Sequence, residues 1–233
     1  MGNISVVDLF KAKVHFGHLK RFVCPKMSKY VYSINNKMSI INLDATLKLL
    51  KVSIDFVNSI VRNNGVVLFV GTKRQARKVV EEYSKKVDMP YVNFRWLGGI
   101  LTNYKTIKKS VKKLKSLQED IDNGKLDHLT KKERLIVNRK LSKLKLNFDG
   151  IKDMKGLPDV LFIIDVNYER IAVLEANKLS IPVIGIVDTN SDPDNIDYII
   201  PGNDDSVESI DFYLKIMTNC IIDVKKRLVA DCQ

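Results

Sequence analysis

The sequence predicts an α/β protein with a parallel β-sheet and an inserted, lysine-rich helical hairpin. Three observations lead to this prediction. Continuous apolar runs bounded by turn residues, such as Val66–Val70, Val160–Ile164 and Val183–Val187, are typical of strands buried on both faces of a parallel sheet. Segments with helical periodicity alternate with these runs, as right-handed crossovers between parallel strands require. Two amphipathic segments rich in lysine separate the second strand from the third.

Residues 1–42 are predicted to form a basic N-terminal arm that is extended and packs on the core in places. A short helix is expected at Asp8–Val14, and basic residues interleaved with aromatic ones follow it. Two short strands are expected at Val31–Ile34 and Ser39–Ile41, on either side of an Asn-Asn turn.

Residues 43–102 and 156–233 are predicted to form the α/β core domain. Its first helix is capped by Asn42 or Asp44 and runs to about Arg62, with an apolar stripe along one side. The other core elements are expected in this order: a strand at Val66–Val70, a helix opened by Gly71 and running to about Val87, strands at Tyr91–Phe94 and Val160–Ile164, a helix at about Tyr168–Lys178, strands at Val183–Val187 and Tyr198–Ile200, and a last helix from Ser206.

Residues 103–155 are predicted to form the inserted antiparallel hairpin. From Tyr104 onward, apolar residues recur at alternating spacings of three and four, which is the seam of a coiled-coil helix. An Asn-Gly pair then offers a turn, and Thr130 with Glu133 has the sequence of a capping box that begins a second such helix. A helix of this length extends about 30 Å, so the hairpin is expected to project beyond the domain.

The distribution of charge indicates a polyanionic partner. The chain has a formal net charge of +12, and residues 103–157 carry 16 Lys and Arg against 7 Asp and Glu, whereas residues 158–233 carry 6 against 14. Such a concentration of positive charge repels itself unless an anion neutralises it. Nucleic acid is the leading candidate. An anionic membrane surface comes second, because no basic cluster adjoins a strongly apolar helix face.

Cysteine usage and the absence of long apolar runs indicate the cellular compartment. No two of the three cysteines form a CxxC motif, which favours a reducing compartment over a disulfide scaffold or a zinc ribbon. The first ten residues are too short and mixed for a signal peptide, and no run approaches membrane-spanning length. We therefore expect a soluble intracellular protein with no membrane partner.

Two phrases of the sequence are candidates for contact with phosphate. Gly71 to Arg74 follows a strand at the start of a helix, where doubly wound folds bind phosphate, although a plain turn is an equal interpretation. No nucleotide-binding glycine motif is present, so one phosphate of an RNA backbone suits it better than a nucleotide. Arg95 can bind phosphate through its forked guanidinium group, and Trp96 can stack on a base or pack inside.

Carboxylates and histidines leave two further alternatives open. Asp165, Asp188 and Asp192 follow strands at the edge where α/β sheets bind ligands, so a Mg²⁺-dependent phosphotransfer enzyme or a receiver-like domain is a rival hypothesis. We favour Asx-turns and helix caps for these aspartates, since turn-forming residues surround them. A metal site of His15, His18 and Cys24 is the second alternative, but their spacing fits no standard zinc pattern and no fourth ligand is evident. We favour contact of these histidines with the RNA backbone, or packing.

A set of phrases spread over nearly the whole chain closely resembles the bacterial type of the small-subunit ribosomal protein S-two family. These phrases are Val14-His15-Phe16-Gly17-His18, Pro25-Lys26-Met27, Phe69-Val70-Gly71-Thr72-Lys73-Arg74, Arg95-Trp96-Leu97-Gly98-Gly99, Gly150-Ile151-Lys152-Asp153-Met154, Ile186-Val187-Asp188-Thr189-Asn190-Ser191-Asp192-Pro193 and Ile200-Pro201-Gly202-Asn203-Asp204-Asp205.

The resemblance implies a flavodoxin-like three-layer sandwich with a protruding hairpin. It implies a non-catalytic structural protein without metal or cofactor, in the small subunit of a cytoplasmic or organellar ribosome. The implied partners are small-subunit rRNA and neighbouring proteins, including the large mRNA-binding protein built of OB repeats. Together with the charge pattern, it predicts the following RNA-binding residues: His15, His18, Lys20, Arg21, Lys26, Lys29, Lys73, Arg74, Arg95, Lys105, Lys108, Lys109, Lys112 and Lys113.

Overall fold

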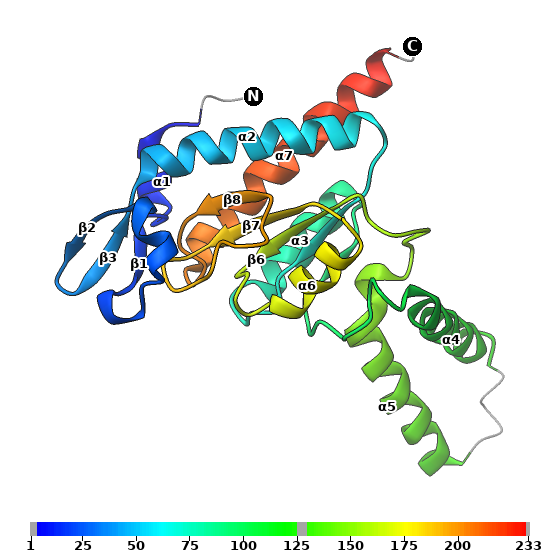
Figure 1. Ribbon diagram of the computed structural model, residues 1–233. Helices are drawn as coiled ribbons and strands as arrows, with labels where there is room; N and C mark the ends of the chain where they lie inside the picture. Colours follow the sequence, from blue (N-terminus) through cyan, green and yellow to red (C-terminus); the bar gives the residue numbers. More distant parts are fainter. Residues whose placement is uncertain (1–3, 125–129, 232–233) are drawn as a thin grey trace.

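The centre of the molecule is a five-stranded sheet in which all neighbouring strands are parallel (Figure 1). The computed structural model describes residues 4–124 and 130–231. The strands lie in the order β5 (Tyr91–Val92), β4 (Val67–Val70), β6 (Val160–Ile164), β7 (Val183–Val187) and β8 (Tyr198–Pro201). This is the flavodoxin-like order, in which the chain reverses direction across the sheet between β4 and β6. The predicted fold class is confirmed.

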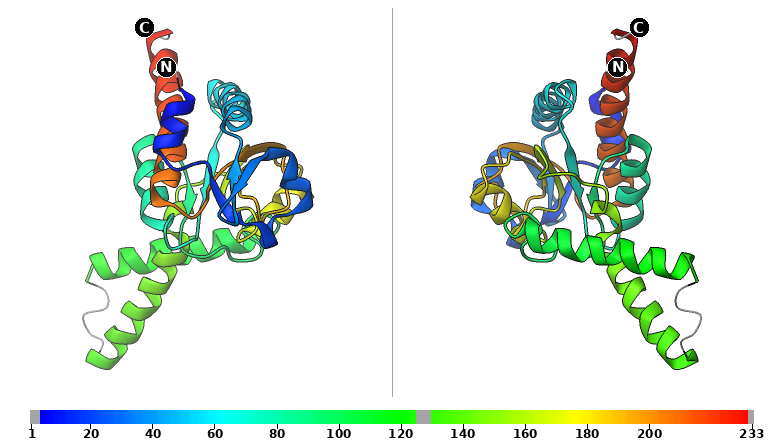
Figure 2. Two further views of the ribbon diagram at one scale, coloured as in Figure 1. Left: turned by 90° about the vertical axis from the view of Figure 1, so that its left-hand side faces the viewer. Right: turned by 90° about the vertical axis from the view of Figure 1, so that its right-hand side faces the viewer.

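Both faces of the sheet are covered, and this explains its uninterrupted apolar strands. Successive side chains of a strand point to opposite faces. Val67 and Phe69 join a core with α2 (Leu43–Arg62), α3 (Arg77–Val87) and α7 (Val207–Asp231). Leu68 and Val70 join a second core with α6 (Arg170–Lys178) and the base of the hairpin. Figure 2 shows the sheet between these two layers.

The N-terminal segment is more structured than its sequence predicts. α1 (Val6–Lys11) precedes a small antiparallel sheet of β1 (Phe16–Leu19), β3 (Met38–Ile41) and β2 (Val31–Asn35), in that order. The strands β2 and β3 are predicted correctly, whereas β1 is not predicted, because its four residues show no clear alternation of exposed and buried positions. The short helices η1 (Lys20–Phe22) and η2 (Pro25–Tyr30) replace the extended backbone expected there.

The hairpin consists of α4 (Tyr104–Asp122) and α5 (Lys131–Phe148), joined to β6 through η3 (Asp149–Ile151). The predicted capping box is present: the Thr130 hydroxyl accepts from the Glu133 amide, and the Glu133 carboxylate accepts from the Thr130 amide at 2.9 Å. The apolar positions nearest the domain belong to the second core. However, Figure 2 shows the two helices crossing at an angle, so the coiled-coil part of the prediction is not confirmed.

Local polar contacts explain why two helices begin later than predicted. α6 begins at Arg170 because Asp165, with φ 63°, starts a turn in which its carboxylate accepts from the Tyr168 amide at 2.9 Å. α3 begins at Arg77, after a loop in which the Thr72 amide bonds to Glu169 at 2.8 Å. The start of α2 is confirmed, since the Asn42 side chain accepts two amide hydrogen bonds in its first turn.

Candidate nucleic-acid interface

A buried carboxylate fixes the loop that leads into the hairpin. Glu175 of α6 accepts five hydrogen bonds from the loop between β5 and α4. One oxygen accepts from the Trp96 indole at 3.1 Å and the Gly99 amide at 2.6 Å. The other accepts from the Leu101 amide at 3.0 Å and from the Thr102 amide and hydroxyl, each at 3.1 Å. This set of bonds holds the loop that leads directly into α4.

The charge of Glu175 is stabilised by these donors. Burial by itself raises the pKa of the carboxyl, but the hydrogen bonds from Gly99, Thr102, Trp96 and Leu101 outweigh burial and lower it. The carboxylate therefore stays ionised at neutral pH. The Trp96 ring is buried in the second core, so of the two roles considered for Trp96, packing inside the protein is the one the structure shows.

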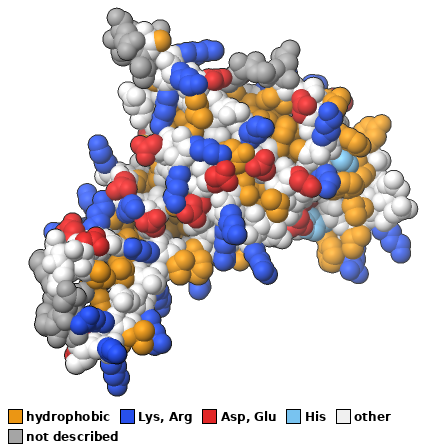
Figure 3. All heavy atoms as spheres, turned by 180° about the vertical axis from the view of Figure 1, so that it is seen from behind, with side chains coloured by type: hydrophobic (Ala, Val, Ile, Leu, Met, Phe, Trp, Pro, Cys, Tyr) orange, Lys and Arg blue, Asp and Glu red, His pale blue; other side chains and the backbone are white. Residues whose placement is uncertain are grey.

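The predicted RNA-binding lysines of α4 are exposed, and none of them forms an ion pair within the described residues. Lys105, Lys108, Lys109, Lys112 and Lys113 all lie at the surface. Within the described part of the chain, no carboxylate lies within ion-pairing distance of their ammonium groups. Apolar residues on the same helix, Ile107 and Leu114, are buried in the second core. The packing of this apolar stripe therefore orients the lysines toward solvent, where an anion can reach them. Figure 3 shows blue lysine and arginine atoms over the projecting hairpin.

Lys73, by contrast, lies in a cluster of aspartates at the carboxyl edge of the sheet. Its ammonium lies 3.0 Å from Asp165, 2.8 Å from Asp204 and 2.5 Å from Asp205. Burial favours its neutral form, but these carboxylates outweigh burial and raise the pKa of Lys73. The cation therefore neutralises charge inside the protein. Contact of Lys73 with RNA stays a prediction, and it would require RNA to compete with three carboxylates.

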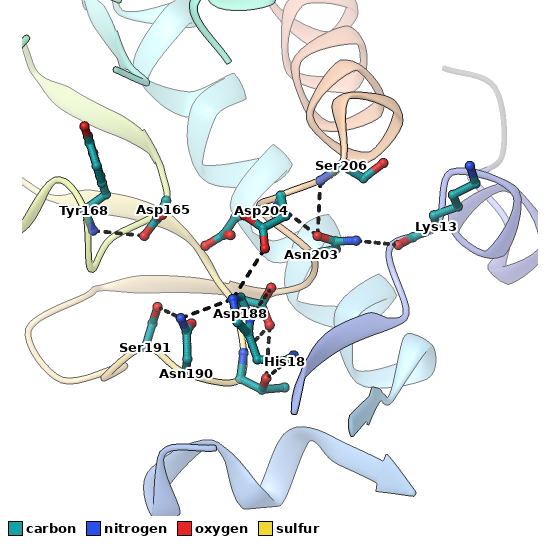
Figure 4. Close-up of polar contacts among 12 residues, drawn as sticks. Lys13, His18, Asp165, Tyr168, Asp188, Asn190, Ser191, Asn203, Asp204 and Ser206 are labelled. Atoms are coloured by element: carbon teal, nitrogen blue, oxygen red, sulfur yellow. Dashed lines mark hydrogen bonds and ion pairs between the residues drawn. The ribbon is translucent and has the colours of Figure 1, made fainter. Parts of the chain in front are cut away.

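The buried aspartate of this cluster titrates far from its usual range. Burial, reinforced by the neighbouring Asp165 and Asp188, raises the pKa of Asp204 to about 7. Figure 4 shows these three side chains approaching one another from the ends of three strands. The convergence follows from the fold, because the carboxyl ends of parallel strands meet at one edge of the sheet.

His18 connects the N-terminal segment to the same edge. Its Nδ1 lies 3.2 Å from the Asp188 carboxylate and its Nε2 lies 3.4 Å from Asp205. The hydrogen bond to Asp188 raises the pKa of the imidazole, although burial opposes the shift. The His18 amide also donates to the Thr189 hydroxyl at 2.8 Å. His18 is thus held in the protein by both its side chain and its backbone.

Asp192, the third aspartate of the rival enzyme hypothesis, makes its ion pair at a different place. It pairs with Lys26 at 2.9 Å, and Asp194 contacts the same ammonium. Its carboxylate also accepts from the Asp194 amide at 3.0 Å, which is the turn contact expected of this sequence. The aspartates are therefore paired with cations or engaged in turns. The described residues contain no group of three or more His, Cys, Asp or Glu placed to hold a metal ion.

The remaining predicted residues of the N-terminal segment differ in exposure. Lys20, Arg21 and Lys29 are exposed, and the Arg21 guanidinium lies over the Phe22 ring, 4.6 Å from its centroid. His15 is buried, with the Phe10 ring stacked on it at 4.4 Å, so RNA could reach it only after it was uncovered. Their contact with RNA stays a prediction.

Arg74 and Arg95 are both exposed and come from loops that follow neighbouring strands of the sheet. Arg74 follows β4 and Arg95 follows β5, and these strands are adjacent. Across residues 4–124 and 130–231, no carboxylate lies within ion-pairing distance of either guanidinium group. Both arginines are accordingly available to an external anion, and the prediction for them remains open.

Two features of the candidate interface could not be predicted from the sequence. One is Glu175, because its position in a helical segment does not distinguish it from an exposed glutamate. The other is an aromatic patch formed by Phe10, Phe16 and Phe22, whose side chains are 60%, 38% and 52% exposed. A depression of about 450 Å³ lies beside Phe16 and Phe22. The interleaving of aromatic and basic residues in the sequence is the only signal that points to this patch, and Figure 3 shows hydrophobic atoms gathered next to the histidines.

The helices of the described residues do not have the character of membrane spans. None of them combines the length and the apolar composition that crossing a bilayer needs. The longest, α7, carries charged residues along its length.

Comparisons with known proteins agree with the fold and the charge pattern. The family model described as ribosomal protein S2 matches residues 9–224. Among similar proteins is the small ribosomal subunit protein uS2 of Hahella chejuensis, 53% identical over 219 residues, which are 94% of this chain and 87% of the relative. The small ribosomal subunit protein uS2 of Marinobacter nauticus is 49% identical over 226 residues, or 97% of this chain and 90% of the relative. The chain therefore belongs to the ribosomal protein S2 family.

Proposed function

We propose that this protein binds small-subunit rRNA chiefly through the lysines of α4, as a structural constituent of the small ribosomal subunit that supports translation. The observation that carries the proposal is the set of exposed α4 lysines, Lys105, Lys108, Lys109, Lys112 and Lys113, that have no carboxylate partner among the described residues. Lysine ammonium groups neutralise phosphates and release counterions, which favours binding without reading the bases. The names of the bacterial relatives support the same role.

The division of charge within the fold supports this assignment of surfaces. At the carboxyl edge of the sheet, Lys26 and Lys73 pair with aspartates of the chain itself. On α4, the five lysines have no such partners among the described residues. RNA that approaches the protein therefore meets uncompensated positive charge on α4, whereas the ammonium groups of Lys26 and Lys73 are already engaged by carboxylates.

The salt dependence of rRNA binding tests the proposal. A variant with Lys108, Lys109, Lys112 and Lys113 changed to Gln should bind small-subunit rRNA with a salt slope reduced by up to about four, roughly one for each phosphate that is no longer neutralised. A control with four exposed lysines away from the hairpin changed to Gln (Lys48, Lys51, Lys215 and Lys226) removes the same charge. Equal slopes for wild type and the α4 variant would contradict the proposal.

Assembly provides a second, independent test. The protein should co-sediment with small ribosomal subunits in a cell lysate and should be stripped from them by high salt, because the contacts are largely electrostatic. We place these ribosomes in the cytoplasm of a bacterium, as the sources of the relatives support. A protein that remained in the soluble fraction at low salt would not fit this assignment.

We also propose that the protein has no catalytic role. Lys73 pairs with Asp165, His18 lies against Asp188, and Asp192 is paired with Lys26, so each carboxylate of the enzyme hypothesis is already engaged by a basic side chain of the protein itself. If the enzyme hypothesis held, Mg²⁺ or a nucleotide would raise the melting temperature of the isolated protein, and Asp188→Asn would abolish that increase. We expect no increase in either protein.

The aromatic patch of Phe10, Phe16 and Phe22 favours docking of a neighbouring small-subunit protein, and we propose the large mRNA-binding protein of OB repeats as its partner. Exposed, adjoining apolar side chains are typical of protein-binding surfaces. Changing Phe16 and Phe22 to Ser should leave rRNA binding intact and lower the amount of that partner on isolated subunits. Val52→Ser, at an exposed position of α2, is the matched control. An unchanged amount of the partner would contradict the proposal.

A further inference from the structure

A groove of about 970 Å³ lies along α4, between this helix and residues 151–155. This volume lies at the upper end of the range of pockets that enclose organic ligands, about 300–1,000 Å³. Its lining includes the apolar side chains of Ile107, Val111 and Met154. The Tyr104 hydroxyl donates to the Met154 carbonyl at 2.7 Å and so fixes residues 151–155 against the start of α4.

The groove combines these apolar residues with an excess of positive charge. Seven lysines and two acidic residues are among the described residues that line it. One of the acids, Asp153, is already neutralised by Lys115 at 2.9 Å. Lys108 and Lys112 line the groove, whereas Lys113, the next residue on the helix, does not. An occupant must therefore supply both several negative charges and apolar surface.

We propose that this groove binds a short segment of unpaired RNA, with its phosphates on the lysines and its bases against the apolar residues and the Tyr104 ring. The inference rests on the proposed function and adds the class of RNA bound. Double-stranded RNA presents phosphates and sugars outward and keeps the faces of its bases stacked inside. It would leave the apolar lining unused. Unpaired nucleotides carry one phosphate each and expose flat apolar faces that stack on aromatic and apolar side chains.

An acidic protein segment is the alternative occupant, since it too combines negative charge with apolar groups. Two observations favour RNA. The positive charge of the groove is continuous with the α4 lysines that are proposed to bind rRNA. The lining also offers no array of backbone donors such as a sheet edge presents to a peptide strand, because it comes from a helix and from residues 151–155, which form no strand.

The test compares two double variants of the full chain with the same loss of charge. Lys108→Gln with Lys112→Gln removes two lysines of the groove, and Lys140→Gln with Lys143→Gln removes two exposed hairpin lysines outside it. Binding of an oligouridylate of about fifteen nucleotides and of its duplex with oligoadenylate is followed by fluorescence anisotropy at about 0.1 M salt. A slope of about 0.7 per neutralised phosphate corresponds to roughly fivefold in affinity per phosphate at this salt concentration.

The groove variant should lose about 25-fold in affinity for the single strand, whereas the control variant should lose less than about threefold. For the duplex, the two variants should lose affinity equally. Equal losses for the single strand would overturn the groove proposal while leaving rRNA binding by the hairpin intact. If neither variant changed affinity for either RNA or for small-subunit rRNA, the proposed function itself would fail.

Two further measurements identify the occupant. An oligouridylate containing 4-thiouridine should crosslink to peptides from α4 or residues 151–155, and crosslinks confined to other peptides would overturn the placement of the bases. Polyglutamate of similar length should not displace the single strand. If it bound more tightly than oligouridylate and lost affinity in the groove variant, the groove would be a site for an acidic protein segment and the RNA proposal would be wrong.

Discussion

Replacing Glu175 with Ala removes the acceptor that holds the loop before the hairpin, and the structure sets the size of the expected effect. The substitution leaves five donor groups without their partner. Those of Gly99 and Thr102 lie where water can reach them. The Trp96 indole and the Leu101 amide belong to residues only 6% and 2% exposed, so water does not readily replace the carboxylate there. A buried donor left without a partner costs about 1–3 kcal/mol, and two of them give about 2–6 kcal/mol.

We therefore expect Glu175→Ala to lower the free energy of unfolding by about 4 kcal/mol, measured by urea denaturation at pH 7. Leu174→Ala, at an exposed position beside it on α6, is the control and should change stability by less than about 1 kcal/mol. The native hydrogen bonds lower the pKa of Glu175. Its contribution is thus present above the unfolded pKa of about 4.3 and disappears as the pH falls through the folded value. If Glu175→Ala behaved like the control, or if its effect were unchanged at acidic pH, the stabilising role assigned to Glu175 would be refuted.

Lys73→Met should lower stability by about 3–5 kcal/mol at pH 8, because it leaves buried carboxylates uncompensated. In urea denaturation the destabilisation caused by Lys73→Met should be smaller at pH 5, where Asp204, with its raised pKa, is protonated. An equal destabilisation at both pH values would contradict this assignment. Thr130→Ala should lower thermal stability by about 1 kcal/mol through loss of the cap of α5. Gly150→Ala should cost about 1–3 kcal/mol, since its Cβ would lie 2.2 Å from the Tyr91 carbonyl oxygen. The raised pKa of His18 means that its ion pair stabilises the fold below the unfolded pKa of about 6.5 and is lost as the pH rises through the folded value, a titration that NMR can follow.

The elements of the core could be predicted because their signals are local. The apolar run Val160–Ile164 is a strand with the predicted bounds, and the caps at Asn42 and Thr130 are where their sequences place them. Helix starts were less accurate. The beginning of α6 depends on a turn closed by Asp165, and sequence periodicity does not show whether a carboxylate closes a turn or caps a helix.

The residues of the candidate interface also differ in how far the sequence could predict their surroundings. The α4 lysines could be predicted as exposed, because they alternate with an apolar stripe whose burial determines their direction. Lys73 could not be told apart from them in sequence. Its partners Asp165 and Asp204 lie 92 and 131 residues away in the chain and approach it only when β4, β6 and β8 align in one sheet.

Sequence alone therefore determined the fold class, the inserted hairpin and the concentration of positive charge on it, since each depends on residue spacing and composition within a segment. Tertiary structure decided which of these charges are available to a partner. It pairs Lys26 and Lys73 with aspartates of the chain and buries Glu175 beneath the loop that leads to α4. It leaves five lysines of α4 without a carboxylate partner among the described residues: Lys105, Lys108, Lys109, Lys112 and Lys113. The physical reason is that ion pairing and burial depend on distances between residues far apart in sequence, and only the packed sheet sets those distances.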